Sequence, residues 1–409
     1  MRNFGASEFP WRGGNRVALL ENGEEFFMRA FALIDAAQRE ILIETFILFE
    51  DKIGLELHRR LIAAARRGVR VELTVDGYGS PHFSPEFLAG FTDAGVRLRL
   101  FDPHPRWLGV RLHAFRRMHR KLLVADARVA LVGGINFSAD HVRDFGAEAK
   151  QDYAVEVEGP AVADIHDFLR AALASQGVGN AWRPARQAES VAQAGATDVM
   201  FVPRDNHRRR GSIEREYRRA IRAARREILL ANAYFFPGYG FLRDLRHAAR
   251  RGVKVTLIFQ GEPDMQVALV AARTLYRYLI EAGVQLHEYC ERPFHGKVAL
   301  VDDDWATVGS SNLDPLSLSL NLEANVFIRD PSFVAELRNN LQHLLQHHCQ
   351  SVDPAQVPRG RFWHVLTRPL LFHVLRRFPD WAGWLPAHTP RVALAKPPPD
   401  EAGAGTTPP

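Results

Sequence analysis

The chain has 409 residues, of which 46% are apolar and 24% charged; this composition excludes disorder as the main state and supplies enough core for two domains. No run of about 18 uncharged apolar residues occurs, and the first residues lack the apolar stretch of a secretory signal, so neither a spanning helix nor an export signal is expected. The net charge of +6, mostly from arginine, fits an anionic partner, either nucleic acid or an acidic membrane surface.

Short β-branched segments alternate with amphipathic segments from the start of the chain. Strands are expected at Ile41–Phe49, Val69–Val75 and Val96–Phe101, and Leu55–Arg67 carries apolar residues at helical spacing. This alternation is the βαβ pattern of an α/β sheet with helices on its faces.

The pattern then occurs a second time. Glu40–Phe49 recurs as Glu227–Phe236, and Arg66–Val75 recurs as Arg250–Phe259. We therefore expect one domain repeated twice, with lobes at residues 1–175 and 200–350 and a linker at 176–199 that is rich in Ala, Gly and Gln. Residues 351–395 form an appendix without a repeat partner, and residues 396–409 are expected to be a disordered tail.

Each copy carries the same polar constellation, His-x-Lys-x4-Asp-x6-Gly-x-x-Asn. Its members are His119, Lys121, Asp126 and Asn136 in the first copy and His295, Lys297, Asp302 and Asn312 in the second. The His, Lys and Asp of both motifs are the candidate catalytic residues, and the asparagines are candidate supporting residues. Because the chain has only six lysines, two matches at equivalent repeat positions are poorly explained by chance.

Strand geometry explains this spacing. Residues i and i+2 of a strand point to the same face, so His119 and Lys121 should project together while Arg120 projects away. Asp126 and Asp302 are expected in hairpin turns, and their return strands are predicted at Val129–Val132 and Ala306–Val308.

Two imidazoles, two ammonium groups and two asparagines that converge would form a site for a tetrahedral phosphate. The lysines would stabilise negative charge on the equatorial oxygens, and the amides of Asn136 and Asn312 and the hydroxyl of Ser310 could donate hydrogen bonds. A phosphodiester exchanged in two steps needs one neutral histidine as nucleophile and one protonated histidine for the leaving alcohol. This chemistry requires no metal and no other cofactor.

A nucleophilic histidine needs its second ring nitrogen held, usually by a carboxylate or a carbonyl. Aligning the strands that follow the two motifs brings Asp152 opposite Glu323, and we predict that these acids orient the histidines. Which acid serves which histidine stays open, Glu148 is an alternative to Asp152, and both acids could instead be ordinary strand-edge residues.

Together these motifs, within residues 15–345, resemble the phospholipase D superfamily, in which two His-Lys-Asp motifs meet between two similar α/β lobes around one active site. The segments Met118–Asp126, Gly133–His141, Trp305–Ser317 and Leu320–Asn325 resemble bacterial cardiolipin synthases, most closely the short B subfamily. The resemblance implies a mixed β-sheet flanked by helices in each lobe, with the lobes related by a pseudo-twofold axis. Gly134 stands where the superfamily usually has Ser, which puts a hydroxyl contact from the first copy in doubt.

The resemblance also implies an activity and a place for it. A phosphatidyl group would pass from one phosphatidylglycerol to another through a phosphatidyl-histidine, with His119 as nucleophile and His295 as general acid and then base. The partner would be an anionic phospholipid membrane, met peripherally at the cytoplasmic face of the bacterial cell membrane, and no nucleic acid is expected. The longer synthases of that family carry two N-terminal spanning helices that this sequence lacks.

Two segments could supply membrane contact. Phe362–Leu385 combines aromatic rings, leucines and arginines, the profile of an interfacial amphipathic element; a C-terminal helix packed on the core is the alternative. Arg204–Arg226 contains ten arginines and could meet an anionic leaflet, or it could be a solvated helix face.

Two further sets of residues are weak indications of a metal site and of a disulfide. His343, His347 and His348 have a spacing that could hold zinc, but no carboxylate or cysteine ligand set accompanies them, and no metal site is predicted. Cys290 and Cys349 are too few for a disulfide framework and fit a reducing cytosol, although they could pair with each other.

Other functions stay open at this point. The same motifs serve nucleases, and lipid hydrolysis or transfer to another alcohol depends on pocket walls that no motif reports. A catalytically dead binding module would require the loss of a motif His or Lys, and none is missing.

Overall fold

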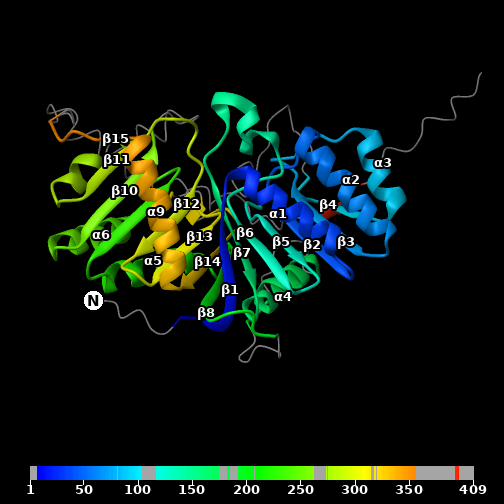
Figure 1. The fold of residues 1–409 in the computed structure, drawn as a ribbon, viewed down its shortest axis with the longest axis horizontal. Coiled ribbons are helices and arrows are strands. Elements are labelled where there is room, and N and C mark those ends of the chain that lie inside the picture. The colour runs from blue at the N-terminus through cyan, green and yellow to red at the C-terminus, as the bar shows by residue number, and fades with distance from the viewer. Residues whose placement is uncertain are drawn as a thin grey trace, which may run out of the picture.

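The structure is a computed structural model that describes residues 7–80, 82–103, 117–174, 182–184, 192–206, 208–261, 273, 275–314, 317–318, 320–355 and 392–395. Within them the chain forms a single mixed sheet of 16 strands. Figure 1 shows this sheet running across the whole molecule, with α1 and α9 on the face toward the viewer.

The N-terminal half contributes the strands β1 (Arg12–Glu21), β2 (Glu40–Thr45), β3 (Arg70–Asp76), β4 (Arg97–Phe101), β5 (Leu122–Ala125), β6 (Val129–Gly133) and β7 (Tyr153–Glu158). Strand β16 (Val392–Leu394), from near the end of the chain, joins the outer edge of this half. Those of the C-terminal half are β8 (Thr197–Arg204), β9 (Glu227–Asn232), β10 (Lys254–Gln260), β11 (Gln285–Tyr289), β12 (Lys297–Val301), β13 (Trp305–Gly309), β14 (Glu323–Arg329) and β15 (Cys349–Ser351).

The helices of the N-terminal half are α1 (Asn22–Ala36), α2 (Lys52–Arg66), α3 (Pro85–Ala94), the 3₁₀ helices η1 (Ala139–His141) and η2 (Arg143–Glu148), and α4 (Ala161–Ala174). Those of the C-terminal half are α5 (Ser212–Ala223), α6 (Tyr239–Arg250) and α9 (Pro331–His347).

The strand order shows the duplication. Outward from the central β1–β8 pair, the sheet runs β7-β6-β5-β2-β3-β4 on one side and β14-β13-β12-β9-β10-β11 on the other. In both halves the three outer strands of this series are parallel to one another, and the inner strands pair antiparallel. The predicted α/β fold with two similar lobes is confirmed, and the two mixed sheets are joined into one through Arg12↔Val199 and Asn15↔Thr197.

Local sequence explains where several helices begin and end. Asp51 caps α2 by accepting from the backbone N–H groups of Ile53 and Gly54, and Asp330 caps α9 by accepting from Phe333 N–H. Helix α3 starts at Pro85 after the Ser84 cap and ends at Gly95, whose φ of +82° is the left-handed conformation that glycine adopts without strain.

Two hydrophobic clusters form the core. One is built mainly from the C-terminal half together with β7 and α4, and the other lies in the N-terminal half between the sheet and α1, α2 and α3. Leu57 and Leu61 of α2, for example, are 0% exposed and belong to the same cluster as Leu73 of β3. Burying these apolar faces fixes the register of the strands that carry the polar motifs.

Two predicted boundaries differ from the structure, and the expected appendix contributes a strand to the sheet. The first strand ends at Thr45 rather than Phe49, because the chain turns there and Ile47 N–H bonds to Asn136. The expected linker ends earlier, because Thr197–Val199 already belong to β8. Within the expected appendix, β16 pairs with the outer strand β4.

The arginine-rich segment Arg204–Arg226 is not a single solvated face. Arg204 and Arg209 are each 1% exposed, and Arg218 and Arg222 of α5 both lie within 3.0 Å of the buried Asp244. The hypothesis that the whole run faces an anionic leaflet is therefore wrong for its buried members.

The rest of the membrane hypothesis concerns residues that the structure does not describe, since Phe362–Leu385 lies outside the described ranges. Among the described helices, none combines the length and the apolar character needed to cross a membrane. Cys290 and Cys349 are free thiols on neighbouring chain segments, since β15 pairs with β11.

Candidate active site

The two motif histidines stand where the halves of the molecule meet. His119 lies just before β5 and His295 just before β12, and each makes a backbone contact with the opposite half. The N–H of His119 donates to Leu322 O at 2.9 Å, and the N–H of His295 donates to Gln151 O at 2.8 Å. Each histidine is thus fixed to the residue that precedes an acid of the other half.

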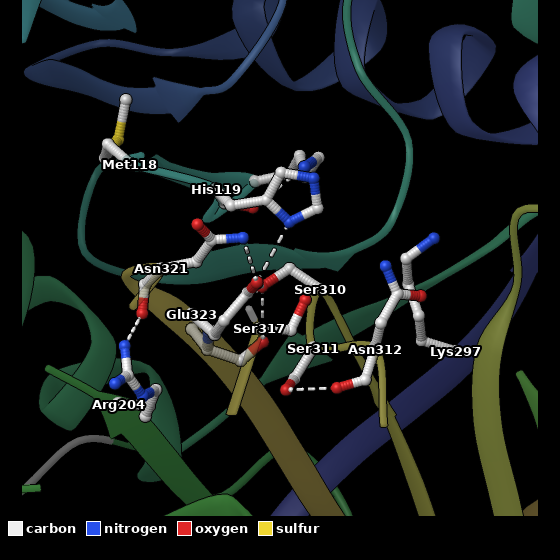
Figure 2. Close-up of polar contacts among 12 residues, drawn as sticks. Met118, His119, Arg204, Lys297, Ser310, Ser311, Asn312, Ser317, Asn321 and Glu323 are labelled. Carbon is white, nitrogen blue, oxygen red and sulfur yellow. Dashed lines mark hydrogen bonds and ion pairs between the residues drawn. The ribbon is translucent and has the colours of Figure 1, made fainter. Parts of the chain in front are cut away.

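Those acids, Asp152 and Glu323, bind the histidine side chains in a crossed pattern. Glu323 Oε2 lies 3.1 Å from His119 Nδ1, and Asp152 Oδ2 lies 2.6 Å from His295 Nδ1. Both carboxylates are fully buried, while the two imidazoles keep 12% and 18% side-chain exposure. Because each Nδ1 is engaged by a carboxylate, Nε2 is the ring nitrogen left to react. Figure 2 shows the His119 ring directed at the Glu323 carboxylate.

The structure therefore places Asp152 and Glu323 on the histidines, and each acid serves the histidine of the other half. Glu148, the alternative to Asp152, is exposed in η2, and in the described part of the chain it makes no hydrogen bond or ion pair with either histidine.

The motif lysines lie beside the histidines. Lys121 Nζ donates to His119 O at 2.8 Å, and Lys297 Nζ donates to His295 O. The lysines are 4% and 1% exposed. Burial lowers the pKa of Lys121 to about 7 and that of Lys297 to about 8. The positive charge of Lys150 lowers the pKa of both lysines further, and that of Lys297 also lowers the pKa of Lys121.

Burial also decides the protonation of the histidines. It lowers the pKa of His119 to about 4, although the Glu323 carboxylate opposes the shift. It lowers the pKa of His295 well below 6.5, helped by the charges of Lys297 and Lys150. Both imidazoles are therefore neutral near pH 7, which is the form a nucleophile needs.

Ser310 and the asparagines differ in what they contact. The Ser310 hydroxyl donates to Glu323 Oε2 at 2.5 Å and accepts from Ala324 N–H at 3.0 Å, so it holds the acid instead of pointing freely at a substrate. Asn136 Oδ1 accepts from Ile47 N–H at 3.2 Å. Asn312 is 6% exposed, and Figure 2 shows its amide on the same side as the Lys297 ammonium group.

The motif aspartates lie at the far ends of β5 and β12, away from the histidines. Asp126 accepts from the backbone N–H groups of Gln38, Arg39 and Glu40 at 2.7–3.0 Å. Asp302 binds the equivalent N–H groups at Arg225, Arg226 and Glu227. Both sit in the predicted hairpin turns with positive φ, 54° and 52°. These contacts are structural, because they tie each hairpin to the start of the neighbouring strand.

Arg120 projects away from the site, as the strand periodicity predicts. Its guanidinium makes a bidentate contact with Glu44 at 2.6 and 3.1 Å, and both side chains are buried. The pair ties the His119 segment to β2, which adds rigidity beneath the nucleophile candidate.

Two residues near the histidines were not predicted from the sequence. The Phe46 ring lies 4.9 Å from the His119 ring and 5.2 Å from Lys121 Nζ. His141 is completely buried beside Asp152 and His295. The second copy has Ala233 where the first has Phe46, so comparing the two copies could have flagged this position.

One group of side chains in the described part of the chain has the geometry to hold a cation. It consists of His141, Asp152 and His295, whose ligand atoms lie within 4.8 Å of one another. A cation there would compete with the hydrogen bond between His295 and Asp152. The rings of His343, His347 and His348 lie 4.6–6.2 Å apart.

Comparison with known proteins gives a consistent result. The family described as cardiolipin synthase, PLD-like domain, matches residues 31–168 and 217–345, one match in each half. Cardiolipin synthase B of Escherichia coli K12 is 54% identical over 95% of this chain and 94% of its own length. Cardiolipin synthase of Geobacillus kaustophilus is 32% identical over 87% of this chain and 71% of its own length.

Among solved structures, a phosphatidylserine synthase of Haemophilus influenzae has the same fold, with a TM-score of 0.67 over 92% of this chain and 95% of that chain at 13% identity. The family match covers more than half of the residues, and the sequence relatives extend over nearly the whole chain. This protein therefore belongs to the cardiolipin synthase family with phospholipase D-like domains.

Proposed function

We propose that this phosphatidyltransferase makes cardiolipin by moving a phosphatidyl group from one phosphatidylglycerol to the hydroxyl of a second, through a phosphatidyl-histidine on His119. The observation that carries the proposal is the crossed pairing of His119 with Glu323 and of His295 with Asp152. It supplies two equivalent imidazoles with free Nε2 atoms, and a two-step exchange at phosphorus uses one as nucleophile and the other to transfer protons.

In the first step His119 Nε2 attacks phosphorus, and the bond from phosphorus to the glycerol oxygen breaks. His295 gives its Nε2 proton to that oxygen, and free glycerol leaves. Burial disfavours a charged His295, so the negative charge of the bound phosphodiester is what favours the protonated imidazole.

In the second step the hydroxyl of another phosphatidylglycerol loses its proton to His295 Nε2 and attacks the phosphorus. The bond between phosphorus and His119 breaks, which releases cardiolipin and restores both histidines. Lys121 and Lys297 place positive charge beside the equatorial oxygens in both steps, inside a site where low dielectric makes each charge more effective.

We further propose that the protein meets its lipid substrate as a peripheral protein at the cytoplasmic face of the bacterial membrane. Phosphatidylglycerol is a membrane lipid, and the net charge of +6 favours contact with an anionic surface. The aromatic and arginine-rich segment Phe362–Leu385 is the proposed interfacial contact.

Mass spectrometry of lipids tests the reaction. Purified protein is incubated with phosphatidylglycerol vesicles, and cardiolipin and glycerol should appear in equal amounts. Phosphatidic acid as the main product would identify a hydrolase, and faster cleavage of single-stranded DNA than of lipid would identify a nuclease. The rate should not change with EDTA, because the lysines provide the positive charge; strong inhibition would contradict this.

A further inference from the structure

The two halves of the site differ in how they hold the orienting acids. In the C-terminal half, Glu323 Oε2 receives both the His119 ring and the Ser310 hydroxyl, at 3.1 and 2.5 Å. The matching position in the N-terminal half is Gly134, and a β-carbon there would collide with the Asp152 carboxylate. The first copy thus has no room for the serine that supports the acid in the second.

His141 occupies the corresponding place beside Asp152. Its side chain is 0% exposed, and its Nδ1 lies 3.8 Å from Asp152 Oδ2, the same oxygen that binds His295 Nδ1 at 2.6 Å. The rings of His141 and His295 meet edge to face with centroids 5.7 Å apart. In both halves, therefore, one carboxylate oxygen faces a motif histidine and a second polar side chain.

The proton on His141 can be placed from its other contact. Its Nε2 accepts the backbone N–H of Asn136 at 3.3 Å, so in the neutral ring the proton must sit on Nδ1. Within the described residues this Nδ1 has no hydrogen-bond partner, although it is buried. A buried N–H without a partner is costly, and Asp152 Oδ2 is an acceptor that a shift of about 1 Å would bring into hydrogen-bond range.

We propose that His141 is a positioning residue of the reaction, which donates from Nδ1 to Asp152 and so holds the acid that orients His295. This inference rests on the proposed roles of His119 as nucleophile and His295 as proton carrier. Asp152 is completely buried and otherwise receives Tyr153 N–H at 2.8 Å on its other oxygen, so a second donor on Oδ2 stabilises its charged form.

The two halves therefore support their orienting acids with different chemical groups. A hydroxyl supports the acid of the nucleophile, whereas an imidazole supports the acid of the proton carrier. Loss of His141 should therefore slow the steps in which His295 gives or takes a proton, and it should spare the first turnover of a substrate whose leaving group needs no proton.

The experiment compares two leaving groups in each variant. Phosphatidylglycerol releases glycerol, which must be protonated, whereas the p-nitrophenyl ester of phosphatidic acid releases p-nitrophenolate, which leaves without a proton. His141→Ala should lower kcat for glycerol release at least about tenfold, part of the roughly 10²- to 10⁴-fold that a positioned acid–base group contributes. KM should be unchanged, and first-turnover release of p-nitrophenolate should stay within about threefold.

Two conservative variants separate positioning from mere packing. His141→Asn keeps an amide where Nδ1 lies, and His141→Gln keeps an acceptor where Nε2 lies for Asn136 N–H. The proposal expects the Asn variant to retain more glycerol release than the Gln variant. Ser310→Ala is the matched control in the other half, and it should slow both leaving groups alike because it acts on the nucleophile.

Equal losses with both leaving groups in His141→Ala, or a Gln variant that matches wild type while the Asn variant fails, would overturn the inference. The readout is the ratio of glycerol release to p-nitrophenolate release, so it does not depend on whether phosphatidylglycerol or water accepts the phosphatidyl group. Wild-type protein that releases glycerol but forms phosphatidic acid would refute the proposed transfer, while the ratio still decides the role of His141.

Discussion

Asp152 from the N-terminal half binds His295 from the C-terminal half at 2.6 Å, and Glu323 and His119 make the reciprocal contact at 3.1 Å. Neither half contains a complete pair of acid and histidine. The catalytic geometry is therefore a property of the contact between the halves.

Replacing either motif histidine should abolish cardiolipin formation while leaving the fold intact. In His119→Ala no phosphatidyl-enzyme can form, so release of p-nitrophenolate should also stop. In His295→Ala the activated ester should still react with His119, but the intermediate should persist and add one phosphatidyl mass to the intact protein. Circular dichroism and thermal melting check the fold; turnover within tenfold of wild type in either variant would rule out the assignment.

The crossed acids predict opposite dependence on the leaving group. Glu323→Gln should slow the release of p-nitrophenolate, because it leaves His119 in the wrong orientation or tautomer. Asp152→Asn should slow glycerol release by roughly 10²- to 10⁴-fold and spare p-nitrophenolate in the first turnover, because it disturbs the proton carrier alone. Stopped-flow absorbance gives the rate of p-nitrophenolate release, and an enzyme-coupled assay of glycerol gives the other rate. The reverse pattern would show that each acid serves the histidine of its own half.

Activity and stability should move in opposite directions as the pH rises above 7. Burial lowers the pKa of Lys121 to about 7 and of Lys297 to about 8, so the free enzyme loses positive charge over this range and kcat/KM should fall. Lysines in the unfolded chain have a pKa of about 10.4. Between pH 7 and about pH 10.4 the unfolded state therefore binds more protons than the folded state, so the free energy of unfolding rises with pH. Urea unfolding and kcat/KM, measured at the same pH values, test this. Lys121→Met should reduce the slope of stability against pH; a wild-type kcat/KM that stays constant to pH 9 would contradict the lowered pKa values.

The motif aspartates should matter for stability more than for chemistry. Asp126 accepts three backbone N–H groups, and its loss leaves these groups without that partner. Asp126→Ala is expected to lower the free energy of unfolding by about 1–3 kcal/mol, with kcat of the folded enzyme within a few-fold of wild type. Asp302→Ala is the matched variant in the other half. A loss of activity as large as in His119→Ala, with unchanged stability, would assign them to the reaction.

The aromatic appendix is expected to hold the protein on anionic vesicles. A chain that ends at Ser351 should be released from vesicles yet should still hydrolyse a short, water-soluble phosphodiester. Because truncation also removes β16 from the edge of β4, a second variant keeps the full chain and replaces Trp381 and Trp384 with Ser. Binding is measured by cosedimentation at about 0.1 M and 1 M salt, where screening lengths are about 10 and 3 Å. Unchanged binding by both folded proteins would place membrane contact elsewhere.

The sequence predicted the duplicated α/β fold because a repeat of βαβ periodicity is visible without tertiary information. It also predicted the two acids, since Asp152 and Glu323 occupy equivalent strand positions after identical motifs. It could not predict that the acids cross between halves, because strand alignment is the same whether an acid faces its own motif or the other one.

The backbone contacts of Asp126 and Asp302 could not be predicted for a related reason. Their fixed spacing from the histidines marks them as part of the motif, but the hairpin turn carries them to the opposite end of the strand. His141 escaped prediction because the second copy has no histidine at the matching place, and its proposed role depends on η1 placing it beside Asp152, which precedes β7.

The reciprocal exchange of acids has the geometry of an isologous dimer contained in one polypeptide. In a true dimer of identical chains, every substitution enters both halves of the interface at once, so the two histidines would have to share the same surroundings. A fused pair is free of that constraint. Gly134 with His141 on one side and Ser310 on the other is the kind of divergence that fusion permits, and it lets two copies of one ancestral motif specialise for different steps of the same reaction.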